Sequence, residues 1–323
     1  MALIGAGSWG CALASVLIEK GHRIRWWVHR EDIADSLLRV GRHPSVFPEH
    51  FFDSAHVEWA GVDVVEGMRQ AEVVVLALPS RYVREVLDGV SLPSVPWVSC
   101  TKGLLPGSVM RPSQYLTERG LSSVGVLSGP SHAEEVILRK PTWVAVGSSS
   151  PEFQKVADSL FALPYFRLLP STCPVSLEWV GVLKNIYAIG VGMVSLWGDN
   201  ARAALAAVAL REMREVLSAL VPEEQPEFLS PAWAGDFLVT AFSGHSRNQR
   251  FGQLLSQGYP PSVALHKLGM VAEGYYAAQS LLSWERVMDF PLLQTIFSVI
   301  RGGEASGTLR ESILDVLSKN IYI

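Results

Sequence analysis

The chain has 323 residues, and at about 150 residues per domain this length predicts two domains, each with its own core. Lys and Arg number 27 and Asp and Glu number 31, which gives a net charge of −4 without a run of like charges and argues against a general nucleic-acid-binding protein. Hydrophobic residues make up 49% and charged residues 18%, so the composition excludes an intrinsically disordered chain.

Signals for secretion, membrane insertion and metal binding are missing from the sequence. Cys11, Cys100 and Cys173 lie far apart, which argues against a disulfide framework and a cysteine zinc site, and the histidines form no pair at ligand spacing. The N-terminal residues do not resemble a signal peptide, and the longest apolar stretch, residues 186–198, is shorter than the roughly 20 residues that cross a bilayer. We expect a cytoplasmic protein with no integral membrane segment, metal or nucleic-acid partner.

The first half of the chain alternates short apolar runs with helix-like stretches, which predicts a mainly parallel sheet covered by helices. Strands are expected at residues 2–4, 23–28, 72–78, 96–100, 124–128, 143–147 and 166–169. The second half has helical spacing at residues 176–197, 201–220, 262–268, 271–285 and 292–300. The fold class is therefore an α/β N-terminal Rossmann-type domain over residues 1–172, followed by an all-α domain over residues 173–323.

Gly5, Gly7 and Gly10 form a G-x-G-x-x-G turn between the first predicted strand and the first predicted helix. In this setting Gly5 permits the tight turn, Gly7 allows the backbone to approach a pyrophosphate, and Gly10 lets the helix pack on the strand. The spacing predicts a dinucleotide site at this turn, with Ser8 and Trp9 inside it.

The end of the second predicted strand bears on the choice between NAD and NADP. An NAD-selective site carries an acidic residue there, whereas this chain has His29 and Arg30, followed by Glu31 and Asp32. A guanidinium suits a 2′-phosphate, which slightly favours NADPH, and the alternative is that Arg30 is a solvated loop charge.

Lys184 stands alone in an otherwise apolar helical stretch. A buried ammonium is costly, so such a lysine is either paired or used in proton transfer, and the alternative is that it extends to solvent. Asp236 and Thr240 are four residues apart on one helical face. Residues 246–250 bring two guanidiniums, an amide and a hydroxyl together, which suits a phosphate but also fits an exposed polar loop.

Together these residues resemble the NAD(P)-dependent glycerol-3-phosphate dehydrogenase family. The resemblance covers almost the whole chain and rests on the motifs Gly-Ala-Gly-Ser-Trp-Gly at 5–10, Thr-Lys-Gly-Leu at 101–104, Ser-Gly-Pro-Ser at 128–131, Leu-Lys-Asn at 183–185, Asn-Ala-Arg-Ala-Ala-Leu at 200–205, Gly-Asp at 235–236, Ser-Arg-Asn at 246–248 and Glu-Gly at 273–274. It implies a Rossmann domain and a helical domain with the active site in the cleft between them. It also implies reversible reduction of dihydroxyacetone phosphate to sn-glycerol 3-phosphate, a homodimer, and a role in glycerophospholipid synthesis.

The resemblance also implies roles for individual residues. Lys184 corresponds to the lysine that exchanges a proton with the oxygen on carbon 2, Asp236 to its orienting partner, and Lys102 to a second catalytic cation. The implied substrate contacts are Lys102, Gly129, Ser131, Lys184, Asn185, Asp236, Thr240, Ser246, Arg247 and Asn248. The implied or predicted cofactor contacts are Gly5, Gly7, Ser8, Trp9, Gly10, His29, Arg30, Lys102, Ala133, Arg247, Val271 and Glu273, for NADP or NAD.

Two other functions remain open on the sequence. A related two-domain 3-hydroxyacid dehydrogenase would use a helix lysine in the same way, but its carboxylate substrate would not need the cluster at 246–248. A nucleotide sensor without turnover would share the glycine turn. The chain departs from the family pattern at Cys11, where Thr is usual, and at His132 and Glu134, where Phe and Lys are commoner.

Overall fold

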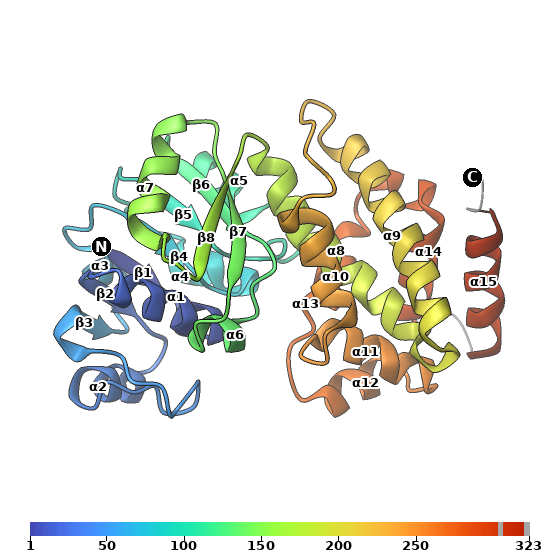
Figure 1. Ribbon diagram of the computed structural model, residues 1–323, viewed down its shortest axis with the longest axis horizontal. Coiled ribbons are helices and arrows are strands. Elements are labelled where there is room, and N and C mark those ends of the chain that lie inside the picture. The colour runs from blue at the N-terminus through green and yellow to red at the C-terminus, as the bar shows by residue number, and fades with distance from the viewer. Residues whose placement is uncertain (303–305, 320–323) are drawn as a thin grey trace. The chain divides into compact units, whose positions relative to one another are not determined.

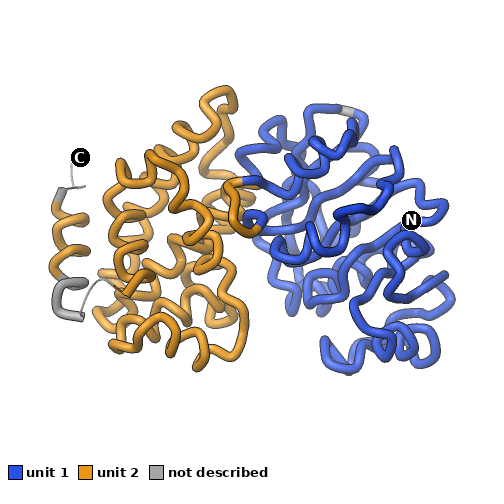
Figure 2. Tube along the Cα trace, turned by 180° about the vertical axis from the view of Figure 1, so that it is seen from behind, with its two compact units in different colours: residues 1–105, 110–177 blue, residues 106–109, 178–323 orange. Residues whose placement is uncertain are grey.

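The computed structural model describes residues 1–302 and 306–319. The chain divides into two compact units, the first made of Met1–Leu105 and Met110–Leu177 and the second of Pro106–Val109 and Glu178–Ile323 (Figure 2). Each unit has its own hydrophobic interior.

An eight-stranded sheet forms the centre of the first unit (Figure 1). The order is β3-β2-β1-β4-β5-β6-β7-β8, and every neighbouring pair is parallel except β6 and β7. The strands are β1 (Ala2–Ile4), β2 (Ile24–Trp27), β3 (Val57–Gly61), β4 (Val74–Leu76), β5 (Trp97–Ser99), β6 (Val124–Ser128), β7 (Thr142–Gly147) and β8 (Phe166–Ser171). The predicted α/β, mainly parallel N-terminal domain is confirmed.

Strand β1 lies at the point where the order of the sheet reverses. All three of its residues are fully buried and pair with β2 on one side and β4 on the other. In an open parallel sheet, the crevice for a ligand lies at the carboxyl ends of the strands beside such a reversal. The turn that follows Ile4 is therefore placed where this fold binds ligands.

Alternate strand residues supply two cores, one on each face of the sheet, because successive side chains in a strand point to opposite sides. Leu3, Trp26 and Val75 pack on one face under the helices α1 (Ser8–Glu19), α2 (Glu31–Arg39), α6 (Ala133–Ile137) and α7 (Pro151–Phe161). Ile4 and Trp97 pack on the other face under α3 (Val64–Met68), α4 (Val83–Leu87) and α5 (Pro112–Glu118).

Strand β3 is absent from the sequence prediction. It is an edge strand that pairs only with β2, and its buried Val57 is followed by the exposed Glu58. Short edge strands carry charges and lack the continuous apolar run of a central strand, so apolar runs do not reveal them.

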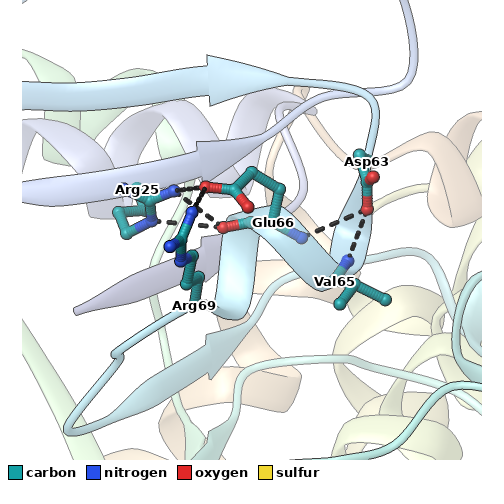
Figure 3. Close-up of polar contacts among 5 residues, drawn as sticks. All are labelled: Arg25, Asp63, Val65, Glu66 and Arg69. Carbon is teal, nitrogen blue, oxygen red and sulfur yellow. Dashed lines mark hydrogen bonds and ion pairs between the residues drawn. The ribbon is translucent and has the colours of Figure 1, made fainter.

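The helix that follows β3 is held at both ends by polar contacts (Figure 3). Asp63 Oδ1 accepts hydrogen bonds from the backbone N–H groups of Val65 (2.9 Å) and Glu66 (3.1 Å), as a capping residue does. Arg25 on β2 donates to the Glu66 carbonyl from Nε (3.2 Å) and Nη2 (2.8 Å), and also to the Glu66 carboxylate (2.7 Å). These contacts fix α3 against the outer strands of the sheet.

The described part of the second unit contains helices and irregular segments and no strand, which confirms the predicted all-α region. Its helices are α8 (Pro174–Met193, which starts in the first unit), α9 (Asp199–Leu220), α10 (Asp236–Phe242), α11 (Arg247–Ser256), α12 (Pro261–Leu268), α13 (Glu273–Leu281), α14 (Pro291–Ile300) and α15 (Ser306–Lys319). From Leu177 to Val194 every residue is buried, which explains why the sequence there is apolar apart from Glu178, Lys184 and Asn185. Among the described helices, none combines the length and apolarity needed to cross a membrane.

Helices α8 and α11 cross at a pair of glycines. A Cβ atom on Gly192 would lie 2.2 Å from the carbonyl oxygen of Gln249, and one on Gly252 would lie 2.1 Å from that of Ile189. Only glycine permits this backbone approach. The crossing holds the helix of Lys184 against the helix of Arg247.

Candidate active site

The glycine turn of the first unit connects β1 to α1 with little space around it. Gly5 has φ +122°, and a Cβ atom there would lie 2.5 Å from the carbonyl oxygen of Ala77. A Cβ atom on Gly10 would lie 2.3 Å from the carbonyl oxygen of Gly5, whereas one on Gly7 would meet no atom within 4 Å. Gly5 and Gly10 are thus required by the fold, and Gly7 leaves open space above the turn.

The N-terminus of α1 is suited to an anion. Gly7 occupies the capping position without a side chain to accept from the first turn, and that turn carries no acidic residue. Gly7 and Ser8 are exposed. An uncapped helix N-terminus offers N–H groups and partial positive charge to a phosphate. The residues present therefore fit the diphosphate of a dinucleotide.

Trp9 and Lys102 lie together beside this turn. The Lys102 ammonium is 5.8 Å from the centre of the Trp9 ring, within the range of a cation–π contact. Trp9 Nε1 is buried and has no hydrogen-bond partner among the residues that the structure describes. Buried donors without a partner are rare in proteins, so this atom also suggests a site for a bound group.

His29 and Arg30 are both exposed just after β2. The Arg30 guanidinium makes two hydrogen bonds to the carboxylate of Asp32, one of them from Nε at 2.8 Å. These hydrogen bonds lower the pKa of Asp32. Arg30 is therefore exposed, as a solvated charge would be, but its guanidinium is already held by a neighbouring carboxylate.

Gly129, Ser131 and Ala133 follow β6 in the first unit. Gly129 has φ +150°, and a Cβ atom there would lie 2.9 Å from Cα of Val144, so its backbone passes close to β7. The Ser131 hydroxyl donates to the Gly129 carbonyl (2.9 Å). Ala133 is buried and begins α6 behind the capping position of His132. This segment packs beside α1.

Lys184 and Asp236 form a buried ion pair in the second unit. Lys184 Nζ donates to Asp236 Oδ1 at 2.5 Å, and the side chains are 5% and 1% exposed. The second carboxylate oxygen, Asp236 Oδ2, is buried without a partner among residues 1–302 and 306–319. The buried Thr240 donates its hydroxyl to the Asp236 carbonyl (2.7 Å) within α10. Lys184 therefore does not extend to solvent but is held in the interior by a carboxylate.

An amide chain connects three helices next to this pair. Asn185 donates to the Gly181 carbonyl (3.0 Å) and accepts from Asn248 Nδ2 (2.8 Å), and Asn248 Oδ1 accepts from the backbone N–H of Gly274 (2.9 Å). A Cβ atom on Gly274 would lie 2.4 Å from the Asn185 carbonyl oxygen. These hydrogen bonds fix α8, α11 and α13 relative to one another. They also occupy the side-chain amides of Asn185 and Asn248, which the resemblance assigns to substrate binding.

Residues 246–250 begin a helix rather than an exposed loop. Ser246 is the capping residue of α11, and its hydroxyl accepts from the backbone N–H of Gln249 (3.3 Å). Arg247 is the first helical residue and is exposed. A guanidinium at a helix N-terminus combines two sources of positive potential for an anion. Val271 and Glu273, which are half-buried, lie near the N-terminus of α13 close to Gly274.

The predicted residues thus form two groups. In the first unit, Gly5, Gly7, Ser8, Trp9 and Gly10 form the glycine turn and its helix, and Lys102 contacts Trp9. In the second unit, hydrogen bonds connect Lys184 to Asp236 and Asn185 to Asn248. The sequence prediction names Gly274 only as part of the Glu-Gly motif and gives it no role of its own, whereas the structure shows its backbone N–H bonded to Asn248.

Comparison with known proteins identifies the family. Two models described as the N-terminus and the C-terminus of NAD-dependent glycerol-3-phosphate dehydrogenase match residues 1–154 and 174–309. The chain belongs to this family.

Named relatives and a solved structure agree with that assignment. Proteins named glycerol-3-phosphate dehydrogenase [NAD(P)+] from Bacillus velezensis and Geobacillus thermodenitrificans are 34% and 36% identical to this chain; the matches cover 97% and 94% of it and 93% and 90% of the relatives. The crystal structure of glycerol-3-phosphate dehydrogenase from Coxiella burnetii has 28% identity and a TM-score of 0.84, with 98% of each chain covered.

Proposed function

We propose that this member of the glycerol-3-phosphate dehydrogenase family reversibly reduces dihydroxyacetone phosphate to sn-glycerol 3-phosphate with NADPH or NADH. The observation that carries the proposal is the buried Lys184–Asp236 pair. Burying an ammonium is costly, so a buried lysine is better explained by a role in proton transfer than by the solvent exposure typical of surface lysines. The relatives named above carry this activity in their names.

The cofactor is proposed to bind at the glycine turn of the first unit. The first turn of α1 would hold the diphosphate, and Trp9 Nε1, His29 and Ala133 are further proposed contacts. When bound, the nicotinamide supplies or accepts the hydride that exchanges with carbon 2 of the substrate. We propose that the protein slightly prefers NADPH over NADH, because the Arg30 guanidinium can exchange its hydrogen bonds to Asp32 for hydrogen bonds to the 2′-phosphate.

In the second unit, Lys184 is proposed to give a proton to, or take one from, the oxygen on carbon 2. Asp236 orients the ammonium through Oδ1 and keeps a second, unpartnered oxygen beside it. Lys102 is proposed as a second cation that stabilises negative charge on the same oxygen. Gly129, Ser131 and Thr240 are proposed to contact the substrate.

Arg247, at the start of α11, is proposed to bind the substrate phosphate. Its exposed guanidinium adds to the partial charge of the helix N-terminus, and binding a remote phosphate fixes the carbonyl for reaction. Arg247, Val271 and Glu273 are also proposed cofactor contacts. Asn185, Ser246 and Asn248 make hydrogen bonds within the protein, so we propose that any contact they make with substrate uses their remaining hydrogen-bonding capacity.

The biological setting is also proposed. We infer a cytoplasmic homodimer whose glycerol 3-phosphate supplies glycerophospholipid synthesis, and a division of labour between residues 1–172, which bind the nucleotide, and residues 173–323, which carry the proton-transfer group. Light scattering of the purified protein at several concentrations tests the dimer.

The decisive test follows the loss of reduced-nicotinamide absorbance when the protein meets dihydroxyacetone phosphate, with NADPH and NADH in separate assays. The variant Lys184→Met should lose about a hundredfold to ten-thousandfold in kcat. Lys155→Met, which removes an exposed lysine on α7, is the matched control and should keep full activity. Nucleotide binding without turnover would overturn the substrate assignment and favour the sensor, whereas turnover of a 3-hydroxyacid that survives Arg247→Ala would favour the related dehydrogenase.

A further inference from the structure

The second half of helix α9 presents a basic face to solvent. Arg211, Arg214, Glu215 and Ser218 lie three or four residues apart, so the helix places them on one face, and all four are exposed. The Arg214 side chain forms no hydrogen bond or ion pair with any residue that the structure describes. This face therefore carries a guanidinium that has no partner in the described fold.

The basic face of α9 lines a cavity of about 600 Å³. A cavity of this size can hold a small-molecule ligand. Its lining combines three guanidiniums with one carboxylate, so it has an excess of positive charge although the chain as a whole is negative. The lining residues are Arg211, Arg214, Glu215, Ser218 and Ala219 of α9, and Arg286 of the short helix η5 (Glu285–Asp289).

Buried contacts hold the two segments that line this cavity. The carboxylate of Glu212, on the buried side of α9, accepts from the backbone N–H groups of Leu292 and Leu293 at the start of α14. Helix η5 leads directly into α14, and the rings of its flanking residues Trp284 and Phe290 stack with their centres 5.6 Å apart. The position of η5 beside α9 is thus fixed before any ligand arrives, which lowers the cost of binding one.

Two of the three guanidiniums already lie near carboxylates. Arg211 Nε is 3.6 Å from Glu215, and Arg286 Nε is 3.2 Å from Asp289. These side chains are between 43% and 58% exposed, and exposed pairs of this kind contribute little because water screens them. An anionic ligand can therefore displace both carboxylates. It would also reduce the repulsion among guanidiniums that stay charged at every pH the fold tolerates.

We propose that this cavity binds a small molecule with two neighbouring phosphate groups, held by Arg211 and Arg214 of α9 and by Arg286 of η5. Guanidiniums bind phosphate oxygens through paired hydrogen bonds, and three of them from two segments offer more donors than a single phosphate can use. The site is independent of the proposed function, because none of its lining residues is among the proposed substrate or cofactor contacts.

The test titrates the full-length protein with pyrophosphate in a calorimeter, at constant ionic strength because salt screens exposed charges. The background is Gly7→Val/Arg247→Gln, which removes the two other places where we expect phosphate groups to bind. Pyrophosphate should still bind to this background, and orthophosphate should bind at least about tenfold more weakly, because one phosphate cannot contact all three guanidiniums. No binding of pyrophosphate, or equal affinity for the two ions, would overturn the proposal.

Variants of exposed arginines then locate the bound ion. Adding Arg214→Gln to the background should weaken pyrophosphate by about tenfold, and adding Arg286→Gln as well should weaken it by about a hundredfold. Arg301→Gln removes an exposed arginine at the end of α14, outside the cavity, and should change the affinity by less than about twofold. Unchanged Tm values show that the variants fold. Undiminished affinity without Arg214 and Arg286 would place the ion elsewhere and overturn the proposal.

A variant with the opposite expected effect completes the test. Glu215→Gln removes the one carboxylate among the described lining residues and should tighten pyrophosphate several-fold, because the ion no longer competes with it for Arg211. Glu223→Gln removes an exposed carboxylate after α9, outside the cavity, and is the matched control. Unchanged or weaker binding in Glu215→Gln would overturn the proposal, since an ion held by these guanidiniums must compete with Glu215.

Discussion

Two ion pairs of this protein differ in solvent exposure, one being buried and the other exposed, and this difference determines how strongly each pair is held. Lys184 and Asp236 are 5% and 1% exposed, so each charge depends on the other for its solvation. Arg30 and Asp32 are more than half exposed, where water screens their attraction. The buried pair is held in one place by its surroundings, whereas the exposed pair is accessible to solvent and to a ligand.

Removing one member of the buried pair should destabilise the fold strongly. Lys184→Met leaves the Asp236 carboxylate buried without a cation, and the free energy of unfolding should fall by about 3–5 kcal/mol. The double variant Lys184→Met/Asp236→Leu removes both charges and should recover most of this loss while remaining inactive. Urea unfolding measures each value; a double variant no more stable than the single one would contradict the expectation.

The exposed pair should affect cofactor choice and not stability. Asp32→Asn frees the Arg30 guanidinium and should tighten NADPH several-fold relative to NADH, because a 2′-phosphate no longer competes with a carboxylate. Arg30→Gln should weaken NADPH about tenfold and change NADH by less than twofold. Dissociation constants for both nucleotides test this, with the unfolding midpoint as the control. An unchanged NADPH to NADH ratio in both variants would show that Arg30 does not contact the nucleotide.

At the scale of elements, each unit has a place where two backbones meet without side chains between them. At the first, α1 starts over β1 with Gly10 against Gly5; at the second, α8 crosses α11 at Gly192 and Gly252. The glycine turn was predictable because its spacing is local. The crossing was not, because residues 60 apart in the sequence make it, and nothing in either segment marks the other as its partner.

The glycine turn offers a test that separates folding from binding. Gly7→Val adds a side chain into open space and should leave Tm unchanged while weakening NADPH by at least about a hundredfold, since the diphosphate must approach this backbone. Gly10→Ala places a Cβ atom against the Gly5 carbonyl and should lower both Tm and NADPH affinity. Melting curves and calorimetry provide both readouts. Normal NADPH affinity in Gly7→Val would place the diphosphate elsewhere.

At the scale of the whole molecule, a single buried carboxylate connects several helices of the helical unit. In the helical unit, the buried Glu212 of α9 accepts from the Tyr187 hydroxyl on α8 (2.8 Å) and from the backbone N–H groups of Leu292 and Leu293 on α14 (both 2.7 Å). One carboxylate thus connects three helices, including the one that carries Lys184. Burial raises its pKa, although these hydrogen bonds act against the shift.

That raised pKa gives the stability of the protein a pH dependence of known sign. Protonation of Glu212 is favoured in the folded state, so its contribution to stability is complete below the ordinary pKa of 4.5 and falls as pH rises through the raised value. The loss of unfolding free energy caused by Glu212→Gln should therefore be larger at pH 5 than at pH 7.5. Glu223→Gln, in an exposed loop, should show no difference between the two pH values. A Glu212→Gln loss that grows with pH would reverse the assigned sign.

The sequence by itself determined the features that repeat locally: the alternation of strands and helices, the glycine turn, the apolar helix around Lys184, and the family motifs along the chain. These follow from periodicity and spacing, which a linear pattern contains. Tertiary structure decided the rest. Three features depend on which distant segments meet: the edge strand β3, the 2.5 Å contact of Lys184 with Asp236, and the amide hydrogen bonds from Asn185 to Gly274. The physical reason is that a buried polar group needs a hydrogen-bond partner, and in these cases the partner comes from a segment that is distant in the sequence.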